Sequence, residues 1–228
     1  MTWFGDFYRS AIGKKAVMAV TGLILFGFVF VHMVGNLKLY LGPEHMNEYA
    51  ESLRTMFTPM VPREGVLWVA RLVLLAAVVL HIHSAWAVSK MSRDARPIAY
   101  QKREYVKASY AARTIRWGGV IVLFFIIYHL LHLTTGHAHR GFVHGDAYGN
   151  VVKGFQVWWV SAIYIVANVA LGLHLYHGVW AMFSSVGVTH ARFDKWRRTF
   201  ATVFAVLITV GNVSFPLAVV TGLVGLQR

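Results

Sequence analysis

Seven of the twelve histidines in this 228-residue chain fall within the apolar segments that are long enough to form membrane-spanning helices. These seven are His32, His81, His83, His129, His132, His174 and His177. An imidazole nitrogen can bind a metal or the iron of a haem, and it can also take up and release protons. Ionisable side chains are costly inside a membrane, so histidines placed there are functional candidates. Hydrogen bonds between helices would account for one such residue, but they explain a set of seven poorly.

The composition indicates a membrane protein. Hydrophobic residues make up 57% of the chain and charged residues 14%, whereas a soluble domain carries about 25% charged and roughly 45–50% apolar residues. The chain contains no cysteine. That absence excludes disulfides, thiolate metal ligands, iron–sulfur ligation by this chain and thioether-linked haem.

The uncharged stretches predict the elements that must position the histidines. They cover residues 16–37, 72–89, 117–139, 154–191 and 199–227. A spanning helix needs about 20 apolar residues. We therefore expect an all-α bundle of five transmembrane helices in a single domain over residues 1–228. The expected helices cover about residues 15–37, 65–90, 114–136, 155–184 and 199–224.

The basic residues predict the orientation. Fifteen Lys and Arg residues fall on the side of the N-terminus, many of them in an inner basic loop over 91–113, and six fall on the other side. The positive-inside rule then predicts a cytoplasmic N-terminus and an outer C-terminus. The net charge of +13 is therefore mainly an orientation signal, and we expect no nucleic-acid partner. The outer loop over 38–64 is predicted to contain a short interfacial helix that begins near Pro43 and ends before Pro59.

Depth along the helices suggests how the histidines pair. At about 1.5 Å per residue, His81 lies roughly 13 Å from Lys90 and His174 roughly 15 Å from the inner end of its helix, so both are in the inner half. His32 and His129 lie roughly 25 Å and 20 Å from the inner ends of their helices, so both are in the outer half. Two pairs on alternate helices are what two stacked bis-histidine haems in a helix bundle need.

An internal repeat supports this pairing. Gly22 precedes His32 by ten residues, and Gly119 precedes His129 by ten residues. Helices one and two thus resemble a first copy of a hairpin, and helices three and four a second copy. Small residues at 22 and 119 would let a porphyrin or a neighbouring helix approach closely.

The residues alone leave the choice of ligands open. His132 follows His129 by three residues and His177 follows His174 by three, so each shares a helix face with its neighbour. Either member of each pair could be the ligand. His83 faces elsewhere. The five remaining histidines, His45, His137, His139, His144 and His190, fall in predicted loops, where they need no special role.

These motifs together resemble the single-chain dihaem cytochrome b anchor of bacterial succinate dehydrogenases and fumarate reductases. The first helix carries Ser10-Ala11-Ile12-Gly13-Lys14-Lys15, Thr21-Gly22 and His32-Met33-Val34-Gly35-Asn36. The second carries Leu80-His81-Ile82 followed by Ala95-Arg96-Pro97, the third runs from Gly119 to His129, and the fourth carries Leu171-Gly172-Leu173-His174-Leu175-Tyr176-His177-Gly178-Val179-Trp180. The resemblance covers roughly residues 8–185.

The resemblance implies a function in respiratory electron transport. It favours His32 with His129 as ligands of an outer haem b, and His81 with His174 as ligands of an inner haem b. The chain would lie in the bacterial inner (cytoplasmic) membrane among lipids and pass electrons to or from a quinone, with menaquinone favoured. Partner flavoprotein and iron–sulfur subunits would hold FAD and the iron–sulfur clusters and perform the succinate chemistry. This chain itself would have no residue catalytic toward succinate.

The resemblance also draws attention to residues around the haems. Candidate contacts for a haem propionate or a quinone are Arg71, Ser84, Trp86, His132, His177, Trp180, Lys14 and Glu64. Some family members place a glutamate near the outer quinone, and Glu51 and Glu64 are the local candidates here. Others carry a glutamate two residues before the helix-four ligand for proton transfer. Gly172 occupies that position here, so this proton path is not expected.

Two other functions remain open from the sequence. The anchor of a hydrogenase or formate dehydrogenase would share the haems and quinone but have different partners. A transporter could use buried histidines as proton relays, but it does not explain the pairing by depth. A bc-type cytochrome is disfavoured, because no two of the histidines in the spans are separated by the 13–14 residues typical of that family.

Overall fold

The computed structural model describes residues 3–95, 110–185, 187–188 and 190–226, and the residues in these ranges form helices and loops without any β-strand. Its helices are α1 (Trp3–Arg9), α2 (Ala11–Asn36), η1 (Leu37–Leu41), α3 (Pro43–Arg54), α4 (Gly65–Asp94), α5 (Tyr110–His129), η2 (Leu130–Thr134), α6 (Ala147–Gln156), α7 (Trp158–Ser185), η3 (Ala191–Phe193) and α8 (Asp194–Val220). The protein is therefore all-helical, as predicted.

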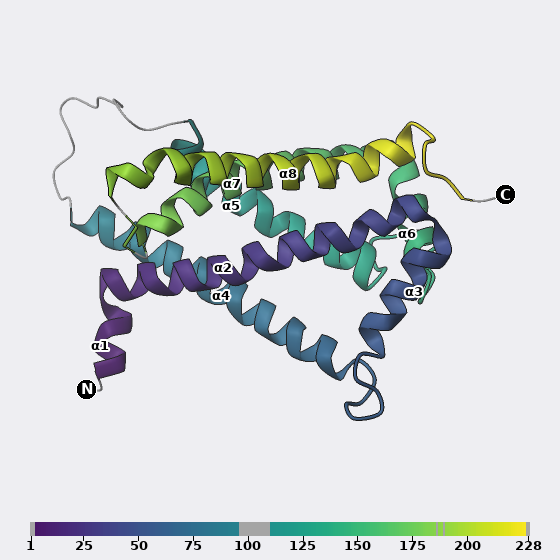
Figure 1. Cartoon of the computed structure of the whole chain (residues 1–228), viewed down its shortest axis with the longest axis horizontal. Coiled ribbons are helices and arrows are strands. Elements are labelled where there is room, and N and C mark those ends of the chain that lie inside the picture. The colour runs from purple at the N-terminus through teal and green to yellow at the C-terminus, as the bar shows by residue number, and fades with distance from the viewer. Residues whose placement is uncertain (1–2, 96–109, 186, 189, 227–228) are drawn as a thin grey trace.

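Five helical stretches are long and apolar enough to cross a membrane. They are Ala11–Leu41, Gly65–Asp94, Ile115–Thr134, Trp158–Ser185 and Ala191–Val220. Figure 1 shows the two ends of the chain at opposite ends of the bundle, with α1 at one end and α3 and α6 at the other. This arrangement is compatible with a membrane location and with an odd number of crossings.

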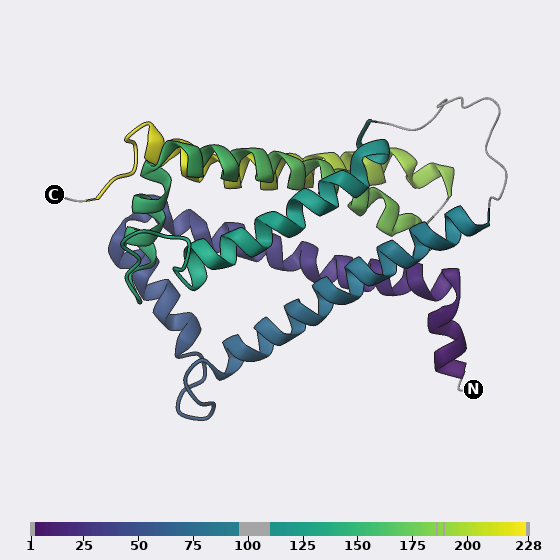
Figure 2. The ribbon, with the colours of Figure 1, turned by 180° about the vertical axis from the view of Figure 1, so that it is seen from behind.

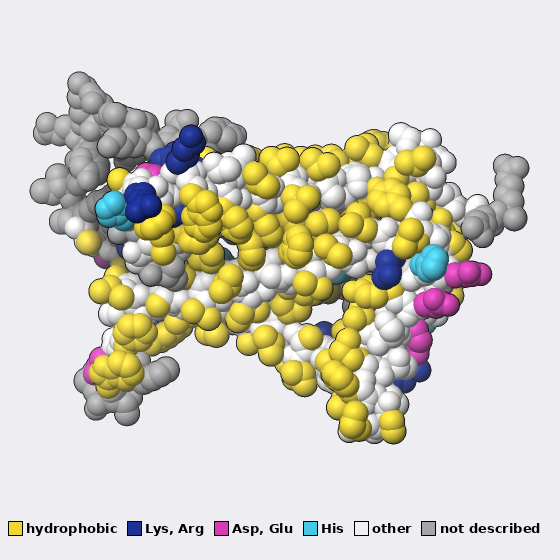
Figure 3. Space-filling view, in the orientation of Figure 1, with side chains coloured by type: hydrophobic (Ala, Val, Ile, Leu, Met, Phe, Trp, Pro, Cys, Tyr) yellow, Lys and Arg dark blue, Asp and Glu magenta, His cyan; other side chains and the backbone are white. Residues whose placement is uncertain are grey.

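The surface supports the same conclusion. In the view of Figure 3, hydrophobic side chains cover the middle of the molecule and charged side chains gather toward its two ends. Large apolar side chains such as Val79, Phe124 and Val210 are 57%, 67% and 64% exposed in the middle of their helices. A continuous exposed apolar belt of this kind suits contact with lipid rather than water.

The helices pack in a definite order. Within the described residues, α2 packs along α4, α5 along α7, and α7 along α8. In both ribbon views α4 crosses α2 and diverges from it toward the end of the molecule where η1 and α3 connect them (Figures 1 and 2). Gly172 permits the close approach of α7 and α8, because a Cβ at this position would collide with Thr209 Oγ1.

Some helix boundaries differ from the sequence prediction for identifiable reasons. The first long helix begins at Ala11 rather than near 15, because the Ser10 hydroxyl accepts a hydrogen bond from Gly13 N at 2.9 Å and caps it. The predicted fourth helix over 155–184 is divided at Val157, whose extended backbone separates α6 from α7. The fifth begins at Asp194 and not near 199. Most of the predicted inner basic loop, residues 96–109, lies outside the described residues.

The outer loop over 38–64 contains the helix that the sequence suggested. Pro43 occupies the first turn of α3, where a missing N–H costs nothing. This helix ends at Arg54, and Met56 and Phe57 lie in the following turns. Helix η2 is a single π-helical turn that follows His129 directly. Such turns often occur at functional sites.

Candidate functional site

The four histidines that the sequence pairs by depth face each other across the bundle in the predicted combinations. The rings of His32 on α2 and His129 on α5 have centroids 5.8 Å apart at an interplanar angle of 84°. The rings of His81 on α4 and His174 on α7 have centroids 6.4 Å apart at 64°. Each pair therefore joins two helices that belong to different hairpins.

The separation of the rings fits coordination of one metal by both. Metal–imidazole bonds are about 2 Å long, as for zinc, so two imidazoles on opposite sides of one metal have centroids about 6 Å apart. In the part of the chain that the structure describes, no group of three or more His, Asp or Glu side chains could hold a metal ion. Two histidines alone therefore suit a cofactor that brings its own equatorial ligands, and haem does so.

The two pairs lie at two depths. His81 contacts α2 at Met18 and Thr21, and the eleven residues from Thr21 to His32 correspond to about 16 Å along the helix. On α7, Tyr164 contacts His129, and the ten residues from Tyr164 to His174 correspond to about 15 Å. Two independent helices thus give the same axial separation between the pairs.

His81 of the inner pair is held by the neighbouring helix α2. His81 Nδ1 lies 3.1 Å from the carbonyl oxygen of Met18 and 3.2 Å from Thr21 Oγ1. A carbonyl oxygen can only accept, so Nδ1 carries the proton and Nε2 keeps its lone pair. That tautomer is the one that can bind a metal through Nε2. His174 Nδ1 makes no hydrogen bond of normal geometry, but this ring interacts with the backbone of Ile115.

The internal repeat is visible in these contacts. Met18 and Ile115 each precede a glycine of the repeat by four residues. A Cβ on Gly22 would lie 3.3 Å from His81 Cε1, and a Cβ on Gly119 would lie 3.5 Å from His174 Cε1. The two glycines therefore make room for the histidine rings of the paired helices. In the outer half, Phe28 and Phe125 each lie four residues before a histidine and pack on its ring.

The outer pair has side-chain neighbours. His129 Nδ1 lies 3.2 Å from the hydroxyl of Tyr164. The same hydroxyl lies 3.0 Å from Nδ1 of His132, which is buried. His132 is thus engaged by a side chain of α7. The side chain of His32 is exposed although it faces His129, so the protein's own side chains do not cover it.

On α4 and α7, three buried polar atoms lie inward of the inner pair and have no hydrogen-bond partner. They are Ser84 Oγ, His177 Nδ1 and Trp180 Nε1. Ser84 follows His81 by three residues and His177 follows His174 by three, so both lie about one helical turn from the ligand positions. Buried polar atoms are normally paired. These atoms therefore suit a polar group, such as a carboxylate or a quinone oxygen, that is not part of the chain.

Two other predicted residues, Lys14 and Trp86, have neighbours within the chain. The Lys14 ammonium lies 3.4 Å from the centre of the Tyr8 ring, and the Tyr8 hydroxyl lies 2.9 Å from Nδ1 of His83. Trp86 is 58% exposed and lies near Lys90. That exposure fits the aromatic belt at a membrane interface. The structure does not bring Lys14 or Trp86 into contact with the histidine pairs.

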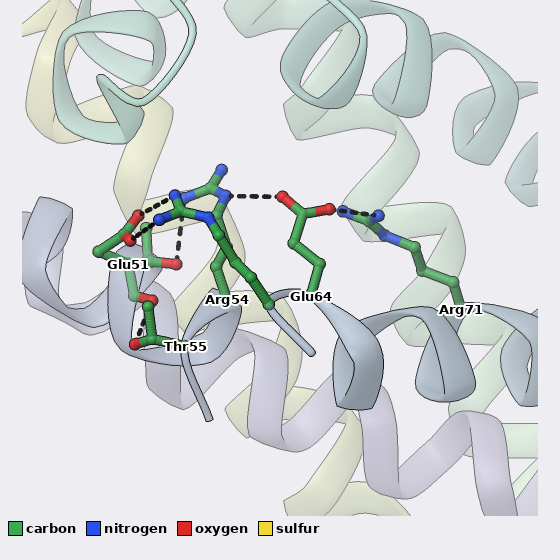
Figure 4. Close-up of polar contacts among 7 residues, drawn as sticks. Glu51, Arg54, Thr55, Glu64 and Arg71 are labelled. Atoms are coloured by element: carbon green, nitrogen blue, oxygen red, sulfur yellow. Dashed lines mark hydrogen bonds and ion pairs between the residues drawn. The ribbon is translucent and has the colours of Figure 1, made fainter. Parts of the chain in front are cut away.

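The predicted residues Arg71 and Glu64 lie in a charged cavity near the end of the molecule that holds α3. Figure 4 shows Glu64 between two arginines, with carboxylate–guanidinium distances of 3.6 Å to Arg54 and 3.5 Å to Arg71. Glu51 pairs with Arg63 at 2.9 Å. The cavity has a volume of about 380 Å³ and is lined by Glu51, Arg54, Arg63, Glu64, Arg71, Thr134, His144 and Gly145. Both outer glutamate candidates therefore border the same space.

Sequence reasoning missed Tyr164 and His139. His139 was expected to be an ordinary loop residue, but it is buried, stacks on His132 with centroids 4.7 Å apart and donates from Nε2 to the carbonyl of Asn150 at 2.9 Å. The ten-residue spacing between Tyr164 and His174 places Tyr164 at the depth of His129, and this spacing is the sequence feature that could have indicated its role.

No family model, curated protein or solved structure matches this chain.

Proposed function

We propose that this chain is the dihaem cytochrome b membrane anchor of a bacterial succinate:quinone oxidoreductase. The observation that carries the proposal is the two facing histidine pairs, His32–His129 and His81–His174, at two depths of an apolar bundle. Each pair would supply the axial ligands of one haem b. When bound, each haem would accept and donate one electron.

The chain's own residues have defined tasks in this proposal. Met18 and Thr21 hold His81 in the tautomer that leaves Nε2 free. Ser84, His177 and Trp180 are the candidates to bind a propionate or a quinone oxygen beside the inner pair. The cavity with Glu64 and Arg71 is the candidate quinone site near the outer pair, because a guanidinium can donate to a quinone oxygen and a carboxylate can hold a proton.

The remaining assignments follow from this function. The N-terminal side would face the cytoplasm of a bacterial inner membrane, where basic residues would dock an iron–sulfur subunit that also binds a flavoprotein subunit. Those partners would hold FAD and the iron–sulfur clusters, since this chain contains no cysteine. Menaquinone is the favoured quinone.

The first test is a dithionite-reduced minus oxidised spectrum of the detergent-purified chain, with pyridine-haemochrome quantitation. We expect two b haems per chain. A folded preparation that was supplied with haem and contains none would overturn the cytochrome proposal in favour of a transporter. Copurification of succinate dehydrogenase activity with the tagged chain separates the proposal from a hydrogenase or formate dehydrogenase anchor.

A further inference from the structure

A buried polar network lies behind the outer histidine pair. The Tyr164 hydroxyl bridges two imidazoles, 3.2 Å from His129 Nδ1 and 3.0 Å from His132 Nδ1. The ring of His132 is 2% exposed and lies between Tyr128, with centroids 5.4 Å apart at 8°, and His139, with centroids 4.7 Å apart at 30°. Packing on both faces therefore fixes the ring of His132.

The network has only one consistent direction if His129 binds a metal. A phenolic hydroxyl has one proton to donate and can also accept, so Tyr164 donates to one imidazole and accepts from the other. With Nε2 of His129 bound to a metal, its Nδ1 must carry a proton. The hydroxyl then accepts from His129 and donates to Nδ1 of His132.

We propose that Tyr164 is the positioning residue of the outer site and that His132 sets the direction of its hydroxyl. This inference rests on the proposed function. The hydrogen bond from His129 Nδ1–H to Tyr164 fixes the orientation and tautomer of the ligand ring and makes the ring a stronger electron donor. His132 acts one step further away, because its lone pair keeps the Tyr164 proton turned away from His129.

The first experiment compares Tyr164→Phe with Tyr128→Phe in the full-length chain. The two tyrosines are neighbours with ring centroids 6.1 Å apart, but the buried Tyr128 hydroxyl has no hydrogen-bond partner. Haem content is measured first, and each b haem is then titrated potentiometrically and examined by low-temperature EPR. The outer haem is identified as the component that disappears in His32→Ala.

We expect Tyr164→Phe to keep both haems and to shift the reduction equilibrium of the outer haem about fivefold toward the reduced form. For one electron this is about 41 mV, at 59 mV per tenfold change. Its EPR signal should change with it, because the ligand ring is no longer held in one orientation. The reduction potential and EPR signal of the inner haem in Tyr164→Phe should be unchanged. Those of both haems in Tyr128→Phe should also be unchanged. An unchanged outer haem in Tyr164→Phe would overturn the proposal.

A second pair of variants covers the case in which Tyr164→Phe fails to retain the outer haem. His132→Asn keeps an acceptor near the position of Nδ1, whereas His132→Leu removes it. We expect the leucine variant to shift the reduction potential of the outer haem as Tyr164→Phe does, or to lose that haem. The asparagine variant should keep an outer haem with a reduction potential close to that of wild type. Equal behaviour of the two would refute the role of His132. Absence of haem from the wild-type chain would instead refute the proposed function.

Discussion

The inner and outer histidine pairs are both imidazole pairs with similar ring separations, but they are held in different ways. His81 donates to a backbone carbonyl of α2, and both inner rings pack against glycines. In the outer pair, His129 contacts the side chain of Tyr164. A backbone contact persists under most single substitutions, whereas a side-chain contact can be removed by one. The outer site is therefore the one whose properties a single substitution can change.

The largest effect should come from removing a ligand. If the proposed function holds, His81→Ala and His32→Ala should each reduce the haem content from two to one per chain, because each change removes one of the two axial ligands of one haem. The lost component should differ between the two variants in the reduced-minus-oxidised spectrum. Loss of the same spectral component in both variants would contradict the proposal that the two histidine pairs hold separate haems.

The second largest effect should come from filling the space beside an inner ring. Gly22→Val would press on His81, since even a Cβ lies 3.3 Å from its Cε1. Overpacking costs about 1–3 kcal/mol. We expect the inner haem to be displaced or its spectrum to change, while the outer haem stays as in wild type.

Gly27→Val is the matched control for this variant. Gly27 lies on the same helix, and a Cβ there meets nothing within 4 Å. The helix propensity cost is the same in both variants, so any difference between them reports contact with His81. If both variants bind the inner haem equally well, then close packing of the ring on Gly22 does not hold the inner site.

A third substitution tests whether α8 supports both pairs through α7. Gly172→Ala should destabilise the chain by about 1–3 kcal/mol, because the new Cβ collides with Thr209. Gly178→Ala on the same helix meets nothing within 4 Å and should be neutral or stabilising. Thermal unfolding in detergent measures both. Selective loss of one haem in Gly172→Ala, with unchanged unfolding, would show that α8 serves one site alone.

The smallest effect should come from Thr21→Val. This change removes one of the two contacts to His81 Nδ1 and leaves the Met18 carbonyl in place. A hydrogen bond contributes about 0.5–1.5 kcal/mol, and the surviving contact should keep the loss near the lower value. The inner haem should therefore keep its potential within the error of a redox titration. A shift of the inner haem's reduction potential as large as that expected of the outer haem in Tyr164→Phe would show that both sites depend equally on side-chain contacts.

The fold and the pairing of the histidines could be predicted because they depend on properties local to each helix. Length and apolar composition predict a span, and the number of residues from a charged end predicts depth. Depth therefore matched His32 with the helical turn of His129 and His132, and His81 with the turn of His174 and His177, and the family resemblance favoured His129 and His174. Glycines at 22 and 119 were predicted to allow close approach, and the histidine rings lie against them.

The features that could not be predicted from the sequence depend mainly on contacts between distant segments. Tyr164 lies 32 residues from His132 along the chain, and nothing in its local sequence indicates a shared hydrogen bond. The burial of His139 follows from the positions of η2 and α6, which a count of apolar residues does not reveal. The break at Val157 depends on backbone geometry within a continuously uncharged stretch.

The segment between α3 and α4 leaves and returns at almost the same point. Glu64 N donates to the Arg54 carbonyl at 2.6 Å, and the side chains of these two residues also pair. Met60 in the intervening loop is 83% exposed. A loop closed at its base can be lengthened without moving the helices that it joins, and exposed loop tips tolerate insertions. The segment 56–62 is therefore a practical position for an epitope tag, whose accessibility in intact cells and in inverted vesicles would reveal the sidedness of the protein.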